Sequence, residues 1–284
     1  MIQIKQSIIL VPLLTLVLGA FAACDKEPQP VDPVDPVNPP VVSAVTPLDY
    51  ISEENLILKG DPAKTFFTYS EALTAAPQGT HLGSRYEWAG IIPLVTDLED
   101  PTVIFVVANE HLAVEEAIQI GDTKATYSSD YKNMGNGISY ALRLAPAKAA
   151  AEEGFPPAQD KKLLAAYRYQ VSEGKDGGFL TVTVRLLGES FDGTIEEIAQ
   201  ESFWAQNKQN DVERQFPFAG QLNGDILDDE GIGGWYWTST PDGDKSAYYV
   251  WIGGGAAGIF DDGKLVVEDY RQMGHSVRPF KDHL

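Results

Sequence analysis

A single cysteine, Cys24, limits how this chain of 284 residues can be stabilised. Without a second thiol the chain cannot form an internal disulfide, so a folded domain must depend on its hydrophobic core. The composition supplies one, because 44% of the residues are hydrophobic and they include 12 Tyr, 12 Phe and 5 Trp. We therefore expect a large packed domain rather than a small disulfide-rich one.

The position of Cys24 predicts lipid attachment. Residues 1–23 have the pattern of a signal peptide, with a positive charge at Lys5, an apolar stretch from Ile8 to Ala20 and small residues before the cysteine. A thiol at this junction can receive diacylglycerol, and acyl chains hold a soluble domain on a membrane without a spanning helix. The alternative is ordinary cleavage after the Ala-Phe-Ala sequence at 20–22, which would release the protein.

Residues 24–47 are predicted to form a lipidated stalk. Asp25-Lys26-Glu27 resembles the surface-export signal of Bacteroidota lipoproteins, which implies the outer face of the outer membrane; the alternative is an ordinary polar spacer. Repeated Val-Asp-Pro triplets within 28–47 favour polyproline II, because proline fixes φ and removes a backbone donor. A globular domain at 48–284 would then stand away from the membrane.

The charge of the chain excludes some partners. The formal net charge is −20, and such a surface repels nucleic acid and anionic lipid headgroups. We therefore expect no nucleic-acid partner, and contact with a membrane only through the lipid anchor.

The residue patterns of the globular part predict both helices and strands. Capping boxes at Ser84–Glu87 and Thr194–Glu197 predict helix starts, and Ser70 opens a short helix before Pro77. β-branched or alternating segments predict strands at 102–108, 113–120, 124–128, 138–144, 163–171 and 179–187. Asp242-Gly243 and Asp262-Gly263 predict hairpin turns in a C-terminal region of short strands. Without regular βαβ alternation, this order favours an α+β fold.

Three C-terminal segments resemble the Fibrobacter-type major paralogous domain. They are Gly-Trp-Tyr-Trp-Thr-Ser-Thr at 234–240, Ala-Tyr-Tyr-Val-Trp-Ile at 247–252 and Gly-His-Ser-Val-Arg-Pro at 274–279. Upstream, residues 79–88 resemble that family's helix start, with Gly83 in place of the usual proline. The long separation between the two regions implies a large β-rich insertion at about 100–190.

That family is related to C-type-lectin-like and formylglycine-generating-enzyme-like folds. The resemblance implies a C-type-lectin-like twisted antiparallel sheet with two flanking helices. Trp235 and Trp237 share one face of a strand, where alternating aromatics are typical of core packing. The alternative is ligand stacking, with Trp251 and Tyr249 as the more exposed members. Arg278 is expected to be a structural ion-pair or hydrogen-bond partner rather than a site residue.

Signals for catalysis and for metal binding are weak. The four histidines are isolated and form no zinc or protease motif, and the reactive cysteines of formylglycine-generating enzymes have no counterpart in the domain. Asp225, Asp228 and Asp229 lie in an oxygen-rich loop, which is the kind of ligand set that Ca²⁺ takes. The alternative is that these residues only form turns.

Together these features predict a non-catalytic binding module of the cell surface, with a glycan or a surface protein as ligand. We expect the site to include Asp242 and Asp244 of the 241–245 loop, and Trp251, which we expect beside that loop by hairpin pairing. A structural or assembly component of a surface complex or fimbria is one alternative. An enzyme with its site in the insertion is another.

Overall fold

The computed structural model describes residues 45–93, 111–148, 153–159, 164–172, 177–253, 256–260 and 270–284. The chain separates into two compact units, Met1–Val42 and Ser43–Leu284, and the fold described below is that of the second. Cys24, the signal peptide, almost all of the stalk, the predicted strand at 102–108 and the Asp262-Gly263 turn lie outside the described residues.

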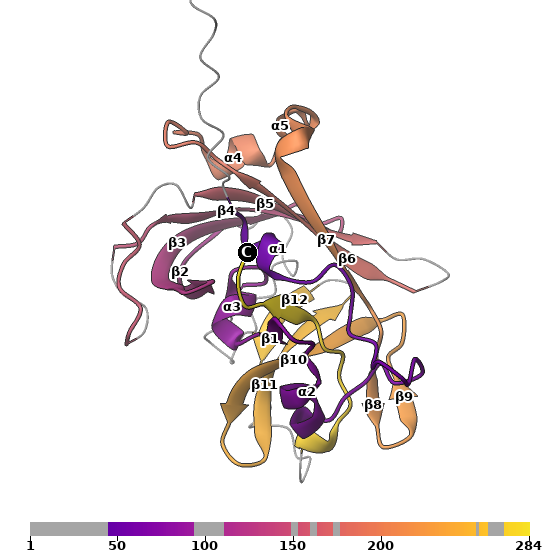
Figure 1. The fold of residues 1–284 in the computed structure, drawn as a ribbon. Helices are drawn as coiled ribbons and strands as arrows, with labels where there is room; N and C mark the ends of the chain where they lie inside the picture. Colours follow the sequence, from indigo (N-terminus) through magenta and orange to yellow (C-terminus); the bar gives the residue numbers. More distant parts are fainter. Residues whose placement is uncertain are drawn as a thin grey trace, which may run out of the picture. The chain divides into compact units, whose positions relative to one another are not determined.

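The largest element is a six-stranded antiparallel sheet in which each strand pairs with the next along the chain (Figure 1). Its strands are β2 (His111–Ile120), β3 (Thr123–Asn133), β4 (Ile138–Pro146), β5 (Ala165–Ser172), β6 (Phe179–Leu186) and β7 (Asp211–Pro217). Five of them cover the strands predicted between 113 and 187. The alternation predicted for 179–187 is confirmed, because Leu180, Val182 and Val184 are all buried in one core.

A second, three-stranded antiparallel sheet follows in the C-terminal part. It consists of β10 (Gly233–Asp242), β11 (Ser246–Gly253) and β12 (Ala256–Phe260). Two short ladders complete the strands: β1 (Thr80–Leu82) with β13 (Pro279–Lys281), and β8 (Gln221–Asn223) with β9 (Ile226–Asp228). The predicted turn at Asp242-Gly243 joins β10 to β11, and Gly243 has the positive φ of 62° that this tight turn requires.

The helices are short. They are α1 (Pro47–Tyr50), α2 (Tyr69–Ala75), α3 (Arg85–Ala89), α4 (Ile195–Ile198) and α5 (Glu201–Ala205), with 3₁₀ turns η2 (Lys208–Asn210) and η3 (Tyr270–Gln272). The predicted α+β class with two flanking helices is therefore wrong: 46% of the structure is strand and 16% is helical. The capping boxes at Ser84 and Thr194 do form. A capping box sets where a helix begins but not how far it runs, and helices of four to seven residues cannot form a layer.

Three hydrophobic cores hold these elements together. The first joins the six-stranded sheet to α3 and to one face of β10 and β11, and the second lies on the other face of β10 and β11. The third covers the opposite face of the six-stranded sheet beneath α4 and α5 (Figure 1). Tyr236 enters the first core and Trp237 the second, so the predicted alternation along this strand is confirmed.

The free side of β7 is covered by the end of the chain. Arg278 donates to the backbone oxygens of Gln215 and Ser52, and the Tyr236 hydroxyl donates to the Pro217 oxygen at 2.6 Å. The prediction that Arg278 is a structural hydrogen-bond partner is confirmed. Its burial lowers the pKa of its guanidinium.

Candidate functional site

Two tryptophans differ in burial from the others. All 5 tryptophans lie within the described residues, and Trp88, Trp204 and Trp237 are at most 2% exposed. Trp235 and Trp251 are only partly buried and pack at the margin of the second core. Large aromatic side chains that remain partly exposed are frequent at binding surfaces, so this pair is the strongest candidate site.

The pair is fixed by the register of β10 and β11. Trp235 lies directly opposite Trp251, and their ring centroids are 6.2 Å apart at an interplanar angle of 60°. The next opposed pair on the same face of the hairpin is Gly233 and Gly253. A Cβ atom at Gly253 would lie 2.6 Å from the Trp251 ring, and one at Gly233 would lie 2.9 Å from the Trp235 ring. The indoles therefore lie over the two glycines, where no side chain would fit.

Behind the pair lies a fully buried aromatic cluster. The next opposed pair on this face is Trp237 and Tyr249. Tyr249 is buried, so the alternative in which it stacks on a ligand does not hold for this residue. The His275 ring stacks on Trp237 with centroids 4.1 Å apart, and Trp237 Nε1 donates to the Phe67 oxygen at 2.8 Å. Burial lowers the pKa of His275 to about 3, so this ring is neutral in the folded protein. The tryptophan pair thus rests on a tightly packed base.

The three residues predicted to bind ligand do not lie together. Asp242 and Asp244 belong to the turn between β10 and β11, whereas Trp251 lies near the far end of the hairpin. At about 3.4 Å per residue, Trp251 is roughly 17 Å along β11 from Ser246, where the strand begins. Arg271 holds the turn by donating to the backbone oxygens of Gly243 at 2.6 Å and Ser246 at 2.9 Å.

Trp251 lies far from the turn because β11 runs on beyond Ser246, and a bulge in β10 also changes which residue it faces. Between Trp237 and Pro241 the pairing of β10 with β11 shifts register. Counted from the turn, where Asp242 faces Ser246, Trp235 would face Gly253 rather than Trp251. The bulge leaves no marker in the sequence that counting could use.

The residues predicted to hold Ca²⁺ are spread over a hairpin. Asp225 is exposed in the turn between β8 and β9, Asp228 ends β9, and Asp229 follows with a positive φ of 58°. Among the described residues, no group of three or more His, Cys, Asp or Glu side chains is arranged to hold a metal ion. The turn-forming role accounts for the positions of these three aspartates.

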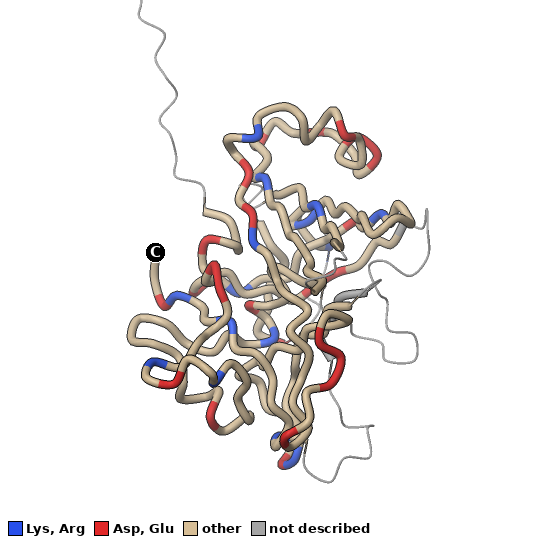
Figure 2. The backbone as a smooth tube through the Cα atoms, turned by 90° about the vertical axis from the view of Figure 1, so that its right-hand side faces the viewer, with Lys and Arg blue, Asp and Glu red and all other residues tan. Residues whose placement is uncertain are grey.

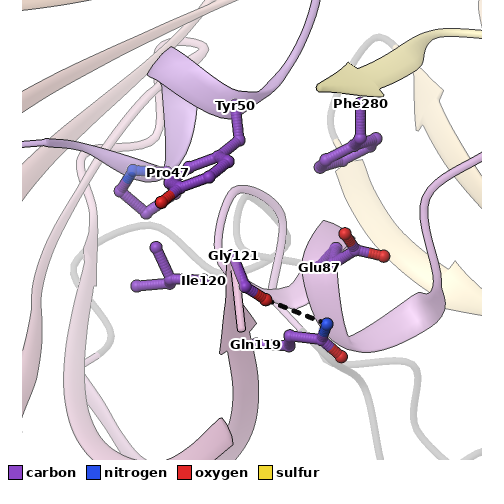
Figure 3. A pocket seen from close by; sticks show the side chains of 7 residues that line it. All are labelled: Pro47, Tyr50, Glu87, Gln119, Ile120, Gly121 and Phe280. Atoms are coloured by element: carbon purple, nitrogen blue, oxygen red, sulfur yellow. Dashed lines mark hydrogen bonds between the residues drawn. The ribbon is translucent and has the colours of Figure 1, made fainter. Parts of the chain in front are cut away.

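A small pocket lies between α1, α3, β2 and β13 (Figure 3). Its volume is about 10 Å³, and it is lined by Pro47, Tyr50, Glu87, Gln119, Ile120, Gly121 and Phe280. Gln119 Nε2 donates to the Gly121 oxygen at 3.0 Å, so this amide closes part of the wall. A pocket of this size has room for about one water molecule.

The acidic group of this pocket is already engaged. Glu87 Oε1 lies 2.7 Å from His81 Nε2, and Glu87 Oε2 accepts from the Ser84 N–H at 2.7 Å. His81 Nδ1 also lies 2.8 Å from Asp282. Its hydrogen bond to Glu87 is the main reason that the pKa of His81 rises to about 9. We interpret this cluster, which sequence reasoning missed, as a clamp between β1, α3 and the chain end.

The geometry defines the chain as a β-rich protein with a six-stranded sheet, a three-stranded sheet and a surface tryptophan pair. Residues 43–280 match the family described as a domain of unknown function (DUF8237), and the chain belongs to that family. No curated protein and no solved structure matches it. In the described ranges, none of the helices is long and apolar enough to cross a membrane.

Proposed function

We propose that this protein is a lipid-anchored binding module of the cell surface, and that its ligand is a saccharide stacked on Trp235 and Trp251. The observation that carries this proposal is the partly buried indole pair held over Gly233 and Gly253. Indole faces pack well on the apolar faces of sugar rings. Cys24, at the end of a signal-like segment, supplies the anchor.

Rigidity favours binding by this pair. The rings are positioned by cross-strand pairing and by a buried base that includes Trp237 and His275. A preorganised aromatic surface loses little conformational entropy on binding, and aromatic anchors of this kind dominate many recognition surfaces. Exposed carboxylates are abundant on the chain and can accept hydrogen bonds from sugar hydroxyls.

A glycan array of the purified full-length protein tests the proposal. We expect hits on specific saccharides, and we expect Trp235→Leu and Trp251→Leu each to weaken binding about tenfold or more. Leu73→Ala is the matched control, because Leu73 is an apolar residue of α2 that is 48% exposed and lies in another element. Melting temperatures identify any variant that has lost its fold.

Tryptophan fluorescence gives a second readout of the same site. Because the other three tryptophans are buried, a saccharide that binds should shield mainly Trp235 and Trp251 from acrylamide. Specific saccharide hits that remain in both tryptophan variants would refute the proposed site. An array without hits, together with a stable protein partner, would favour the assembly-component alternative instead.

A further inference from the structure

The β8–β9 hairpin exposes large apolar side chains. Ile226 is 64% exposed and Leu227 is 41% exposed, and Ile232, shortly after the hairpin, is 66% exposed. Ile232 and Ile226 are the two most exposed large hydrophobic residues among those that the structure describes. Adjacent exposed apolar residues on one short segment are typical of an interaction surface.

One backbone edge of this hairpin is open. On its inner side, Leu222 exchanges two hydrogen bonds with Gly274, each 2.8 Å long. Leu227 lies opposite Leu222. Because Leu222 uses both of its backbone groups on Gly274, these two residues form a non-hydrogen-bonded pair, in which the backbone groups point away from each other. The N–H and C=O of Leu227 therefore point outward, and within the part of the chain that the structure describes no strand pairs with the outer side of β9.

The charged residues in this part of the chain have one sign. Residues 215–244 contain no Lys or Arg. Four acidic residues belong to or directly follow the hairpin: Asp225, Asp228, Asp229 and Glu230. Figure 2 shows acidic positions at several loops and turns of the chain. A partner that adds to β9 must therefore carry positive charge beside its apolar residues.

We propose that β9 accepts an extended segment of a partner protein, apolar on one face and carrying Lys or Arg, as an added antiparallel strand. The outward N–H and C=O of Leu227 provide main-chain hydrogen bonds, and Ile226 and Ile232 provide apolar contacts. The surrounding carboxylates select for basic side chains and against acidic ones.

The charge also argues against two other occupants of this edge, a second copy of the chain and its own stalk. A second copy would place the same acidic hairpin against itself, in a protein whose net charge is already −20. The stalk of this chain at 28–42 contains aspartates and no Lys or Arg, so it is not complementary either. Natural edge strands are commonly protected by lysine or proline, and β9 has neither.

Binding of two matched peptides to the full-length protein tests this inference. One alternates valine with lysine, and the other replaces each lysine with glutamate. We expect the lysine peptide to bind at least about tenfold more tightly by fluorescence anisotropy, and to slow amide exchange at Leu227. Leu227→Pro should abolish binding, because proline removes the outward N–H while β8 keeps its bonds to Gly274.

Two further variants keep the test decisive if Leu227→Pro does not fold. Ile226→Thr should weaken binding of the lysine peptide, whereas Ile57→Thr, at a residue that is 54% exposed outside the hairpin, should not. Equal affinity for the two peptides, or unchanged binding by Ile226→Thr, would overturn the proposal. So would a dimer in light scattering that Ile226→Thr disrupts, because the occupant would then be a second copy. Neither result depends on saccharide binding at Trp235 and Trp251.

Discussion

At the scale of single residues, two histidines make stability depend on pH in opposite directions. Burial lowers the pKa of His275 to about 3, against an ordinary value of 6.5. Below pH 6.5 His275 is protonated in the unfolded chain but stays neutral in the folded one, so the free energy of unfolding falls as the pH drops below 6.5. The pKa of His81 is raised to about 9, so its stabilising effect is complete below 6.5 and is lost as pH rises toward 9.

We therefore predict that the protein is most stable near pH 6.5. Between pH 6.5 and 5, His275 should contribute a slope of up to about 1.4 kcal/mol per pH unit to the free energy of unfolding. Urea unfolding over this range, which lies above the titration of most carboxylates, measures that slope. His275→Asn should flatten it.

His283→Asn provides the control, because His283 is exposed near the chain end. Its slope between pH 6.5 and 5 should match that of the parent. Above pH 6.5 the decline should shrink in His81→Gln, which lacks the ionisable group between Glu87 and Asp282. A parent protein whose stability is flat from pH 6.5 to 5 would contradict the buried neutral state of His275.

Sequence reasoning at this scale succeeded where a residue is fixed by its own strand. The burial of Trp237 follows from the alternation along its strand and is confirmed. The structural role expected for Arg278, which lies just before β13, is also confirmed. It failed for Trp251, which was expected beside the 241–245 loop, because β11 carries this residue to the far end of the hairpin. The His81 clamp joins residues that are 201 positions apart, and no local pattern reports such a contact.

At the scale of elements, buried arginines of the large sheet donate hydrogen bonds to the backbone oxygens at the ends of short helices. Arg143 of β4 donates to the backbone oxygens of Ala89 and Ile91 at the end of α3, and Glu116 lies 3.3 Å from its guanidinium. Arg185 of β6 does the same for α5, where it donates to the Phe203 and Trp204 oxygens. A five-residue helix leaves most of its carbonyls unpaired, so these guanidiniums satisfy groups that the helix cannot.

We predict that Arg143→Met destabilises the protein by about 3–5 kcal/mol, because it leaves the buried Glu116 carboxylate without its cation and α3 without its cap. Arg168→Met, in the next strand, should cost about 1 kcal/mol or less, since Arg168 is only partly buried and stacks on Trp204. Urea unfolding of both variants gives the comparison.

The double variant Arg143→Met with Glu116→Gln separates charge from packing. It should recover part of the loss, because no buried charge remains unpaired. If Arg143→Met were no more harmful than Arg168→Met, the guanidinium would not be the cap that the geometry indicates.

The same arginines show why the elements were predicted better than the fold class. Strands of the large sheet were visible because β-branched residues and alternation mark them locally. Helix starts were visible for the same reason, through their capping boxes. Helix lengths were not, because the side chains that cap Ala89 and Ile91 come from a strand more than 50 residues away. Two helices flanking a sheet were expected, whereas the structure has short helical turns capped by side chains of other elements.

At the scale of the whole molecule, the chain has a packed unit at 43–284 and a proline-rich segment that precedes it in the sequence. The packed unit has three cores and no disulfide, because the only cysteine lies at position 24. The stability of this unit therefore does not depend on an oxidising environment, which fits the surface display that we propose.

Brief treatment of intact cells with elastase should therefore release a compact fragment. Elastase cleaves after small aliphatic residues, and Val31, Val34 and Val37 precede Asp or Asn rather than proline. We expect the released fragment to begin between residues 32 and 43, because the unit that follows is packed and resists proteolysis. Cys24→Ser should instead appear in the medium without elastase, since it lacks the acyl chains. Protection of the parent in intact cells, with cleavage only after lysis, would place the protein on the inner side of the outer membrane and refute display.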